Sequence, residues 1–226
     1  MNNKDVRRGA NIYSKPVLGF YDLLVVRLSN TLAWRCPSRL MLDQYNRFLG
    51  QEHLDVGPGT GWYLIHAHLP ERNRITLMDL NENSMEHTGF RLAGMPTAGT
   101  RPAPRAVTGN VLEPIPEHLG NFDSIATNYL FHCIPGTWET KSEAFGHLAD
   151  RLTDDGVLFG GTILGHGVRH NTVGKGLMAL YNRMGIFHNR DDAEAGLQQA
   201  LERSFHQTSV KVVGTVAVFN ARQPRR

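Results

Sequence analysis

Glycines and an aspartate with a spacing suited to ligand binding follow the first expected strand. The segment Asp55-Val56-Gly57-Pro58-Gly59-Thr60-Gly61 comes directly after a short β-forming run and before a helical stretch. Glycines at alternate positions let the backbone turn tightly and approach a ligand without an intervening side chain. Such a turn also occurs for purely structural reasons, so it does not identify a ligand by itself.

Two carboxylates narrow the choice of ligand. Asp55 lies at the end of the first strand, where a dinucleotide site needs no acidic group and where a carboxylate can hold the ammonium of an amino-acid ligand. Asp79 ends the next strand, from which a carboxylate can accept hydrogen bonds from both ribose hydroxyls. As structural alternatives, Asp55 could cap a loop and Asp79 could cap the following helix. At the strand ends of one βαβ unit, the pair predicts a ligand with ribose and ammonium groups.

The order of expected elements places these residues at one edge of a sheet. The expected strands are 53–56, 74–79, 105–108, 122–127, 156–164, 208–213 and 215–221, and the expected helices are 17–30, 38–49, 62–69, 82–92, 137–152, 173–184 and 191–203. This alternation predicts an α/β fold: a Rossmann-like, doubly wound, seven-stranded and mostly parallel sheet, with a C-terminal antiparallel hairpin that turns at Gly214. Residues 1–50 would form an N-terminal helical cap and residues 51–226 one compact domain. The loops after the parallel strands would share one ligand-binding edge.

Five segments resemble the signature motifs of class I S-adenosylmethionine-dependent methyltransferases, and together they cover roughly 52–164. They are Leu54–Gly61, Met78–Asn81, Thr108–Val111, Phe122–Tyr129 and Leu152–Phe159. The resemblance implies S-adenosylmethionine as methyl donor, S-adenosylhomocysteine as product, and a compact set of cofactor-binding residues. That set is Asp55, Gly57, Gly59, Gly61, Asp79, Leu80, Gly109, Asn110, Val111, Asn128 and Tyr129.

One position departs from the family pattern. The family often carries an aspartate where this chain has Asn110, beside the adenine amino group. The amide oxygen of asparagine can still accept a hydrogen bond, so we expect that contact to survive. By the same resemblance, the three glycines line the methionine and ribose, Leu80 covers one adenine face, and Asn128 and Tyr129 border the sulfonium.

The chemistry itself needs few protein groups. Methyl transfer from a sulfonium is an in-line displacement, so the protein has to place a nucleophile about 3–3.5 Å from the methyl carbon and exclude water. A general base is required only when the acceptor arrives protonated. His132 follows the fourth expected strand and is the candidate catalytic base, with a histidine that satisfies local backbone groups as the alternative.

Other candidates lie in a loop and in the N-terminal cap. His166, Arg169 and His170 follow the fifth expected strand and could shape an acceptor pocket, although a solvated loop accounts for them as well. Family members that act on small molecules often use a leading helical region as a lid. Within the first 50 residues, Tyr13 is the candidate for a cofactor contact and Tyr21 for an acceptor contact, whereas Tyr45 is expected to pack in the core.

Composition excludes several classes of protein. The net charge of +3 is too small for a nucleic-acid-binding surface, and no apolar run approaches the roughly 18 residues of a membrane span. The two cysteines, Cys36 and Cys133, lack metal-ligand spacing, so we expect no metal and a reducing, cytoplasmic setting. The loop after the fourth strand also lacks the prolines typical of enzymes that methylate DNA bases.

The remaining interpretation is an enzyme that methylates O, N or C of a small-molecule metabolite, with secondary metabolism as the expected setting. The sequence is compatible with a homodimer but does not determine the oligomeric state. One alternative is a methyltransferase-like protein that binds the cofactor without transferring its methyl group. Another is an RNA methyltransferase, whose RNA affinity would depend strongly on salt.

Overall fold

The computed structural model describes residues 30–95, 99 and 101–226. Tyr13, Tyr21 and nearly all of the helix expected at 17–30 lie outside these residues. The strands are β1 (Glu52–Val56), β2 (Arg74–Asp79), β3 (Arg105–Thr108), β4 (Phe122–Asn128), β5 (Leu152–Ile163), β6 (Phe205–Val213) and β7 (Val216–Pro224). The helices are α3 (Ser38–Phe48), α4 (Trp62–His66), α5 (Glu82–Ala93), α6 (Trp138–Ala149), α7 (Thr172–Arg183) and α8 (Glu194–Ser204), with the 3-10 turns η3 (Glu117–Leu119) and η4 (Phe131–Cys133). No helix of the described ranges is both long and apolar enough to cross a membrane.

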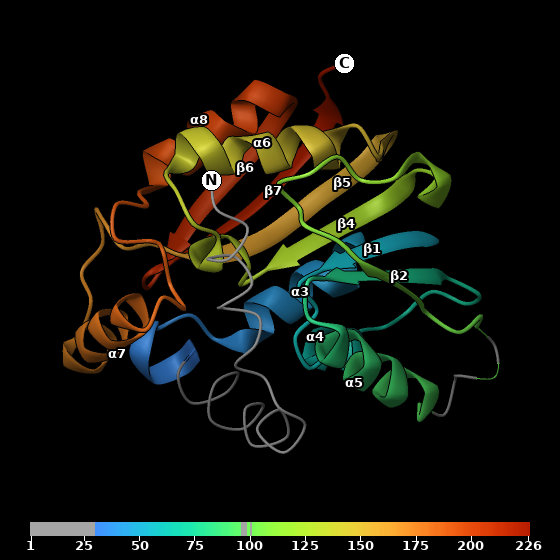
Figure 1. Ribbon diagram of the computed structural model, residues 1–226, viewed down its shortest axis with the longest axis horizontal. Coiled ribbons are helices and arrows are strands. Elements are labelled where there is room, and N and C mark those ends of the chain that lie inside the picture. Colours follow the sequence, from blue (N-terminus) through green and yellow to red (C-terminus); the bar gives the residue numbers. More distant parts are fainter. Residues whose placement is uncertain (1–29, 96–98, 100) are drawn as a thin grey trace.

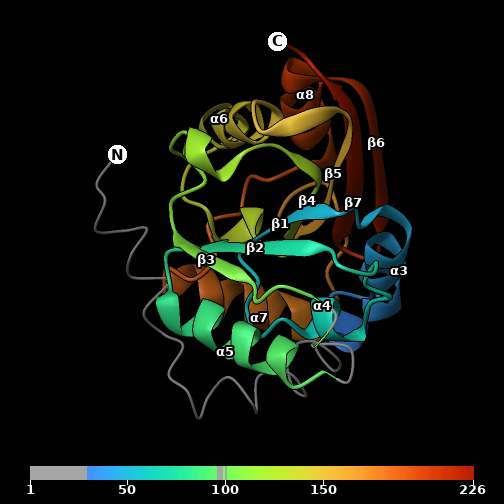
Figure 2. The same cartoon turned by 90° about the vertical axis from the view of Figure 1, so that its right-hand side faces the viewer.

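The strands form one seven-stranded sheet in the order β3-β2-β1-β4-β5-β7-β6. β1 pairs in parallel with β2 and β4, as β2 does with β3 and β4 with β5, whereas β7 runs antiparallel to both β5 and β6. Helices α6 and α8 cover one face of the sheet, and α3, α4 and α5 lie on the other (Figures 1 and 2). The predicted Rossmann-like fold is confirmed. From β1 the strand order runs to β2 and β3 on one side and to β4 and β5 on the other. In such sheets a ligand binds between the loops that follow the two strands at this switch point, here β1 and β4.

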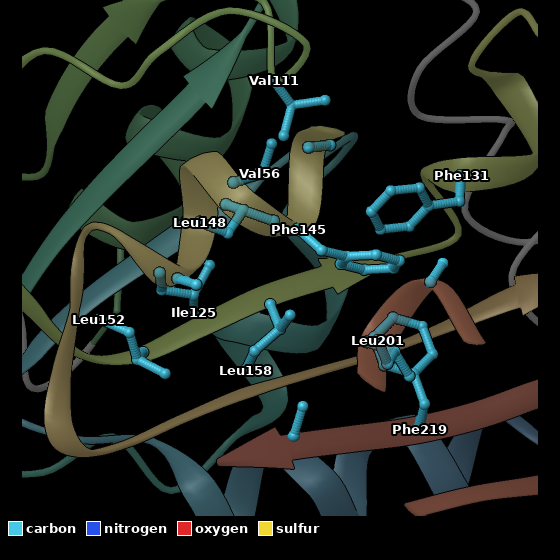
Figure 3. Close-up of a cluster of buried hydrophobic side chains, with 14 of the residues drawn as sticks. Val56, Val111, Ile125, Phe131, Phe145, Leu148, Leu152, Leu158, Leu201 and Phe219 are labelled. Atoms are coloured by element: carbon cyan, nitrogen blue, oxygen red, sulfur yellow. The ribbon is translucent and has the colours of Figure 1, made fainter. Parts of the chain in front are cut away.

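The larger core lies between the sheet and helices α6 and α8. Phe145 and Leu148 of α6 are fully buried and belong to the same apolar cluster as Ile125, Leu158 and Phe219 of the strands (Figure 3). Burial of a side chain of this size contributes about 1.5–3 kcal/mol. This core gives β4 and β5 a rigid base from which their loops extend to the site.

The start of β5 corrects one expected boundary. The run Asp154-Asp155-Gly156 predicts a turn before the strand, but β5 already begins at Leu152, which pairs with Phe122. The next pair is Ser124 with Val157, so the turn-forming residues make an irregularity inside the ladder. Aspartate and glycine favour local bends, and a bulge satisfies that preference without ending the strand.

The C-terminal hairpin turns at Gly214, as predicted. Its φ of +63° favours glycine, and a Cβ there would lie 2.2 Å from the carbonyl oxygen of Trp34. The backbone N–H of Thr215 donates to that same oxygen at 2.9 Å. The hairpin therefore anchors residues 34–35, where the chain enters the described fold.

Candidate cofactor and acceptor site

The glycine turn after β1 has the backbone conformation that its sequence predicts. Gly57, Gly59 and Gly61 all have positive φ, at +70°, +59° and +70°. A Cβ on Gly57 would lie 2.9 Å from Leu130, and one on Gly61 would lie 2.5 Å from Thr88, whereas a Cβ on Gly59 would meet no described atom within 4 Å. The turn is thus enclosed at its two ends and open at its middle.

Helix α5 fixes the turn through hydrogen bonds to its carbonyls. Ser84 Oγ and Thr88 Oγ1 both donate to the Gly59 carbonyl, at 2.8 and 3.3 Å, and Arg91 Nη1 donates to the Thr60 carbonyl at 2.7 Å. With its carbonyls held by α5, the turn presents a fixed backbone to the open space beside Gly59.

Asp55 is buried at the end of β1, with 2% of its surface exposed. The Tyr45 hydroxyl donates to its Oδ2 at 2.7 Å, and His53 Nε2 lies 3.8 Å from the same oxygen. Burial, with a further contribution from the Asp55 charge, raises the pKa of Tyr45 well above its usual value. Tyr45 packs in the core as expected, but its contact with Asp55 was not anticipated from the sequence.

Asp79 lies at the end of β2 and is not the cap of the next helix. Asn81 is the N-cap of α5 and accepts from the backbone N–H of Asn83 at 3.1 Å, while Asp79 Oδ1 accepts from the backbone N–H of Asn81 at 3.0 Å. Burial raises the pKa of the Asp79 carboxyl, the nearby Asp55 charge adds to the rise, and the backbone hydrogen bond from Asn81 opposes it. A desolvated carboxylate of this kind is stabilised by further donors.

The end of β3 completes this side of the site. The backbone N–H of Gly109 donates to the Asp79 carbonyl at 3.2 Å, so β2 and β3 end together. Asn110 Oδ1 accepts from the backbone N–H of Leu112 at 3.1 Å and retains a second lone pair. The Val111 side chain is 5% exposed and packs in the larger core, whereas Leu80 remains half-buried.

Buried polar atoms without partners gather just after β4. By strict hydrogen-bond geometry, the polar atoms of the Asn128 side chain, Tyr129 Oη and His132 Nδ1 have no partner among the described residues. The Asn128 side chain nevertheless lies near the Tyr45 hydroxyl, and the Tyr129 hydroxyl lies near the Cys36 thiol. Tyr129 also has a φ of +55°, which is strained for a residue with a side chain. An unsatisfied buried polar atom costs about 1–3 kcal/mol, so these atoms are candidates for contact with a ligand.

His132 is enclosed by aromatic rings. It is 4% exposed, and its ring lies edge-to-face on Phe187 at 4.5 Å and on Tyr129 at 6.1 Å. Burial, assisted by the charge of Lys141, lowers the pKa of His132 to about 3. The imidazole is therefore neutral near pH 7, and its Nδ1 does not serve a local backbone group.

Comparisons with known proteins agree with this geometry. A protein named YbcY from Escherichia coli (strain K12) is 46% identical over 196 residues, covering 86% of this chain and 97% of that protein. Methyltransferase verB of Penicillium polonicum is 38% identical over 230 residues, covering 95% of this chain and 98% of verB. Demethylluteothin O-methyltransferase of Streptomyces thioluteus is 36% identical over 210 residues, covering 92% of this chain and 88% of that enzyme. N-methyltransferase vrtF of Penicillium aethiopicum is 36% identical over 198 residues, covering 85% of this chain and 78% of vrtF. The chain belongs to the class I S-adenosylmethionine-dependent methyltransferases. No protein-family model matches it.

Solved structures show the same fold as this methyltransferase. A DhpI–S-adenosylhomocysteine complex superposes with a TM-score of 0.68 at 14% identity and covers the whole of both chains. An O-methyltransferase family protein from Burkholderia thailandensis gives a TM-score of 0.66 at 16% identity, and the methyltransferase spans 61% of that longer chain. At these identities the likeness establishes the fold.

The three candidate residues in the loop after β5 differ in burial. The side chains of His166 and Arg169 are exposed, as the solvated-loop interpretation predicts. His170 is half-buried, its Nε2 lies 2.9 Å from the Leu164 carbonyl, and its ring is edge-on to Trp34 at 6.2 Å. The acceptor-pocket roles of these three residues stay predictions.

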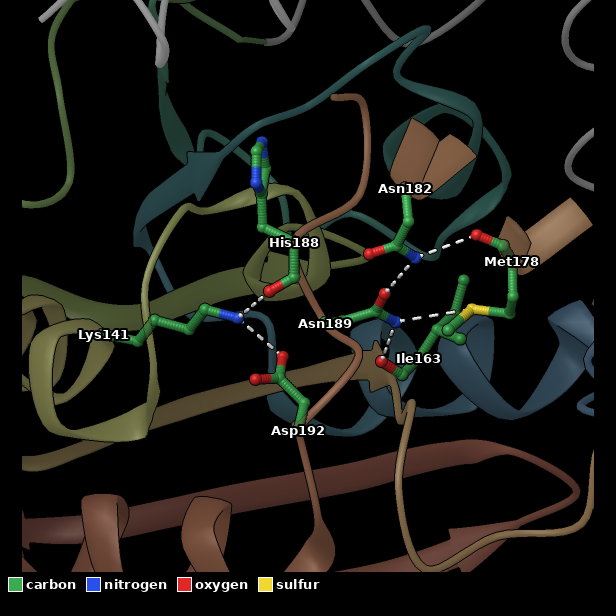
Figure 4. A network of polar contacts seen from close by, with 7 residues as sticks. All are labelled: Lys141, Ile163, Met178, Asn182, His188, Asn189 and Asp192. Atoms are coloured by element: carbon green, nitrogen blue, oxygen red, sulfur yellow. Dashed lines mark hydrogen bonds and ion pairs between the residues drawn. The ribbon is translucent and has the colours of Figure 1, made fainter. Parts of the chain in front are cut away.

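A buried polar network supports the wall of the methyltransferase site behind His132. Lys141 Nζ of α6 bonds to Asp192 Oδ2 at 2.6 Å and to the His188 carbonyl at 3.0 Å, and Asn189 Nδ2 donates to the Ile163 carbonyl at 2.8 Å (Figure 4). The backbone N–H of His188 donates in turn to the His132 carbonyl at 2.7 Å. The loop between α7 and α8 is thereby tied to η4 and to the end of β5. No sequence pattern signalled this network, in which Lys141 and Asp192 lie 51 residues apart.

Proposed function

We propose that this enzyme holds S-adenosylmethionine along the glycine turn and transfers the methyl group in line to a hydroxyl oxygen of a small molecule at the end of β4. The observation that carries the proposal is the group of unpartnered buried polar atoms on Asn128, Tyr129 and His132. Leu130, which lies between them, is the residue that a Cβ on Gly57 would contact. Leu130 therefore brings the loop after β4 against the glycine turn.

The residues around the turn fit the chemical groups of the cofactor. Asp55 would hold the ammonium, and Asp79, a desolvated carboxylate, would accept from the ribose hydroxyls. The open space at Gly59 would receive the methionine and ribose against bare backbone. Residues after β2 and β3 would contact the adenine: Leu80, Gly109, Asn110 and Val111. Val111 would do so through its backbone, because its side chain packs in the core. When bound, the cofactor supplies a methyl group on a sulfonium, which leaves as a neutral thioether.

The surroundings of His132 favour a neutral, protonated acceptor. In the tautomer whose proton is on Nε2, the neutral His132 imidazole has a lone pair on the unpartnered Nδ1, which can accept a hydrogen bond from an acceptor O–H and so orient an oxygen lone pair toward the methyl carbon. As the new O–C bond forms, His132 takes the hydroxyl proton, which passes to solvent after the methylated product has left. Phe187 and Tyr129 exclude solvent around the imidazole. The names of related O-methyltransferases support oxygen as the acceptor atom, and that of an N-methyltransferase marks nitrogen as the competing outcome.

Incubation with methyl-labelled S-adenosylmethionine and matched panels of phenols and aromatic amines tests the proposal. We expect label to appear in phenol ethers and the Asp79→Asn variant to lose transfer. Tight cofactor binding without transfer to either panel would contradict the proposal and favour a binding protein. Transfer to amines alone would contradict the proposed oxygen acceptor.

A further inference from the structure

Asp55 is approached by aromatic side chains that lie outside the glycine turn. The Tyr45 hydroxyl donates to Asp55 Oδ2 at 2.7 Å, and the two residues are each 2% exposed. A hydrogen bond to a charged group in a buried setting is stronger than one between neutral groups. The contact therefore has enough strength to determine the orientation of the carboxylate.

Packing fixes the direction from which the hydroxyl approaches. The Tyr45 ring is stacked on Tyr63, with centroids 5.7 Å apart and an interplanar angle of 10°, and lies edge-on to Phe159 at 5.2 Å. Helix α3 itself rests against β5 and α4 (Figure 1). Held on two sides, the ring has little freedom to turn its hydroxyl away from Asp55.

His53 presents a second polar group to the same carboxylate. His53 and Asp55 alternate on β1 and share one face of the strand, with His53 Nε2 3.8 Å from Asp55 Oδ2. Ser124 Oγ accepts from the backbone N–H of Gly50 at 2.9 Å and lies 2.8 Å from His53 Nδ1, so its own hydrogen can be donated to Nδ1. His53 Nε2 faces Asp55 across a gap too long for a hydrogen bond.

We propose that Tyr45 is a positioning residue for cofactor recognition: its hydroxyl holds Asp55 Oδ2 and leaves the other carboxylate oxygen to receive the cofactor ammonium. This inference rests on the proposed function, in which Asp55 binds that ammonium. Without the Tyr45 hydrogen bond the carboxylate would turn and lose its fixed geometry. The loss would affect only ligands that carry the amino-acid group.

Two probes separate this role from a structural one. S-adenosylhomocysteine carries the ammonium, whereas 5′-methylthioadenosine shares the adenosine but lacks the amino acid. For Tyr45→Phe we expect the dissociation constant for S-adenosylhomocysteine to rise about tenfold and that for 5′-methylthioadenosine to change less than about twofold, both by calorimetry. Tyr63→Phe is the matched control, since Tyr63 stacks on Tyr45 and its hydroxyl accepts from Asn30, with a similarly small effect expected on both probes.

A double-mutant cycle tests whether Tyr45 acts through Asp55. Adding Tyr45→Phe to Asp55→Asn should weaken S-adenosylhomocysteine binding by less than about twofold further. Equal weakening for both probes, unchanged affinity for S-adenosylhomocysteine, a full tenfold loss in the Asp55→Asn background, or a variant that no longer folds would each overturn the inference. A wild-type protein that binds neither probe would instead contradict the proposed function.

Discussion

Replacement of Gly61 by alanine should destabilise the fold strongly. Gly61 has a φ of +70°, and an L-residue in this region loses about 1–2 kcal/mol. The new methyl would also lie 2.5 Å from Thr88 Cγ2 and 2.9 Å from its Oγ1, an overlap in a packed site that costs about 1–3 kcal/mol. Together these effects predict a loss of roughly 3 kcal/mol in the free energy of unfolding.

Gly59→Ala provides a matched comparison within the same turn. Its φ of +59° carries the same backbone strain, but a methyl there meets no described atom within 4 Å. We expect a loss of only about 1–2 kcal/mol. Because the open space at Gly59 is the proposed position of the cofactor, this milder variant should nevertheless weaken S-adenosylhomocysteine binding.

Urea unfolding of the ligand-free variants, followed by tryptophan fluorescence, measures both losses. In the Gly61→Ala background, Thr88→Ser removes Cγ2 but keeps the hydroxyl that bonds the Gly59 carbonyl, and it should restore about 1 kcal/mol or more. Equal losses for Gly59→Ala and Gly61→Ala, together with no rescue by Thr88→Ser, would refute the reasoning.

Three further predictions concern buried ionisable groups. His132→Ala should lower kcat at least about 100-fold without changing the affinity for S-adenosylhomocysteine. Because the pKa of His132 is about 3, the pH profile of the wild-type kcat should show no histidine inflection between about pH 5 and 9. An inflection near pH 6.5 that disappears in the variant would contradict this prediction. Burial raises the pKa of Asp79 in the folded state, so its ionised form destabilises the fold once the pH exceeds the pKa of the unfolded chain. Asp79→Asn should therefore raise the Tm of the ligand-free protein at pH 7, with a smaller gain at pH 5, while weakening cofactor binding by about 1.5–3 kcal/mol; a lower Tm at pH 7 would contradict the assigned sign. Lys141→Met should lower the free energy of unfolding in urea by about 3–5 kcal/mol, because it leaves Asp192 buried without its ion-pair partner. The double variant Lys141→Met with Asp192→Leu should lose less stability than Lys141→Met alone. Additive losses in the double variant would contradict the buried ion pair.

Local sequence patterns predicted the conformation of the glycine turn and the place of Asp79 at a strand end, because both features are local. The glycine turn and Asp79 follow strands recognisable from their own composition, and parallel strands end at a common edge. The contact between Tyr45 and Asp55 depends instead on how α3 packs against β5 and α4, which no short-range pattern records. The position of His132 could be predicted, but its burial against Phe187 depends on a loop far along the chain.

Strand boundaries show the same division. The ends of β2 and β3 match the sequence prediction because apolar runs and flanking turn residues agree there. At β5, residues 154–156 have a turn preference that pairing with β4 overrides, which moves the start of the strand to Leu152. Local preference is therefore decisive for β2 and β3 and yields to pairing at the start of β5.

A crystal structure of the protein with S-adenosylhomocysteine tests the central claim most directly. The account predicts the ligand along residues 55–61, with its ammonium at Asp55, its ribose hydroxyls on Asp79, and its sulfur facing Asn128, Tyr129 and His132. A ligand bound elsewhere, or one whose ribose makes no contact with Asp79, would contradict it.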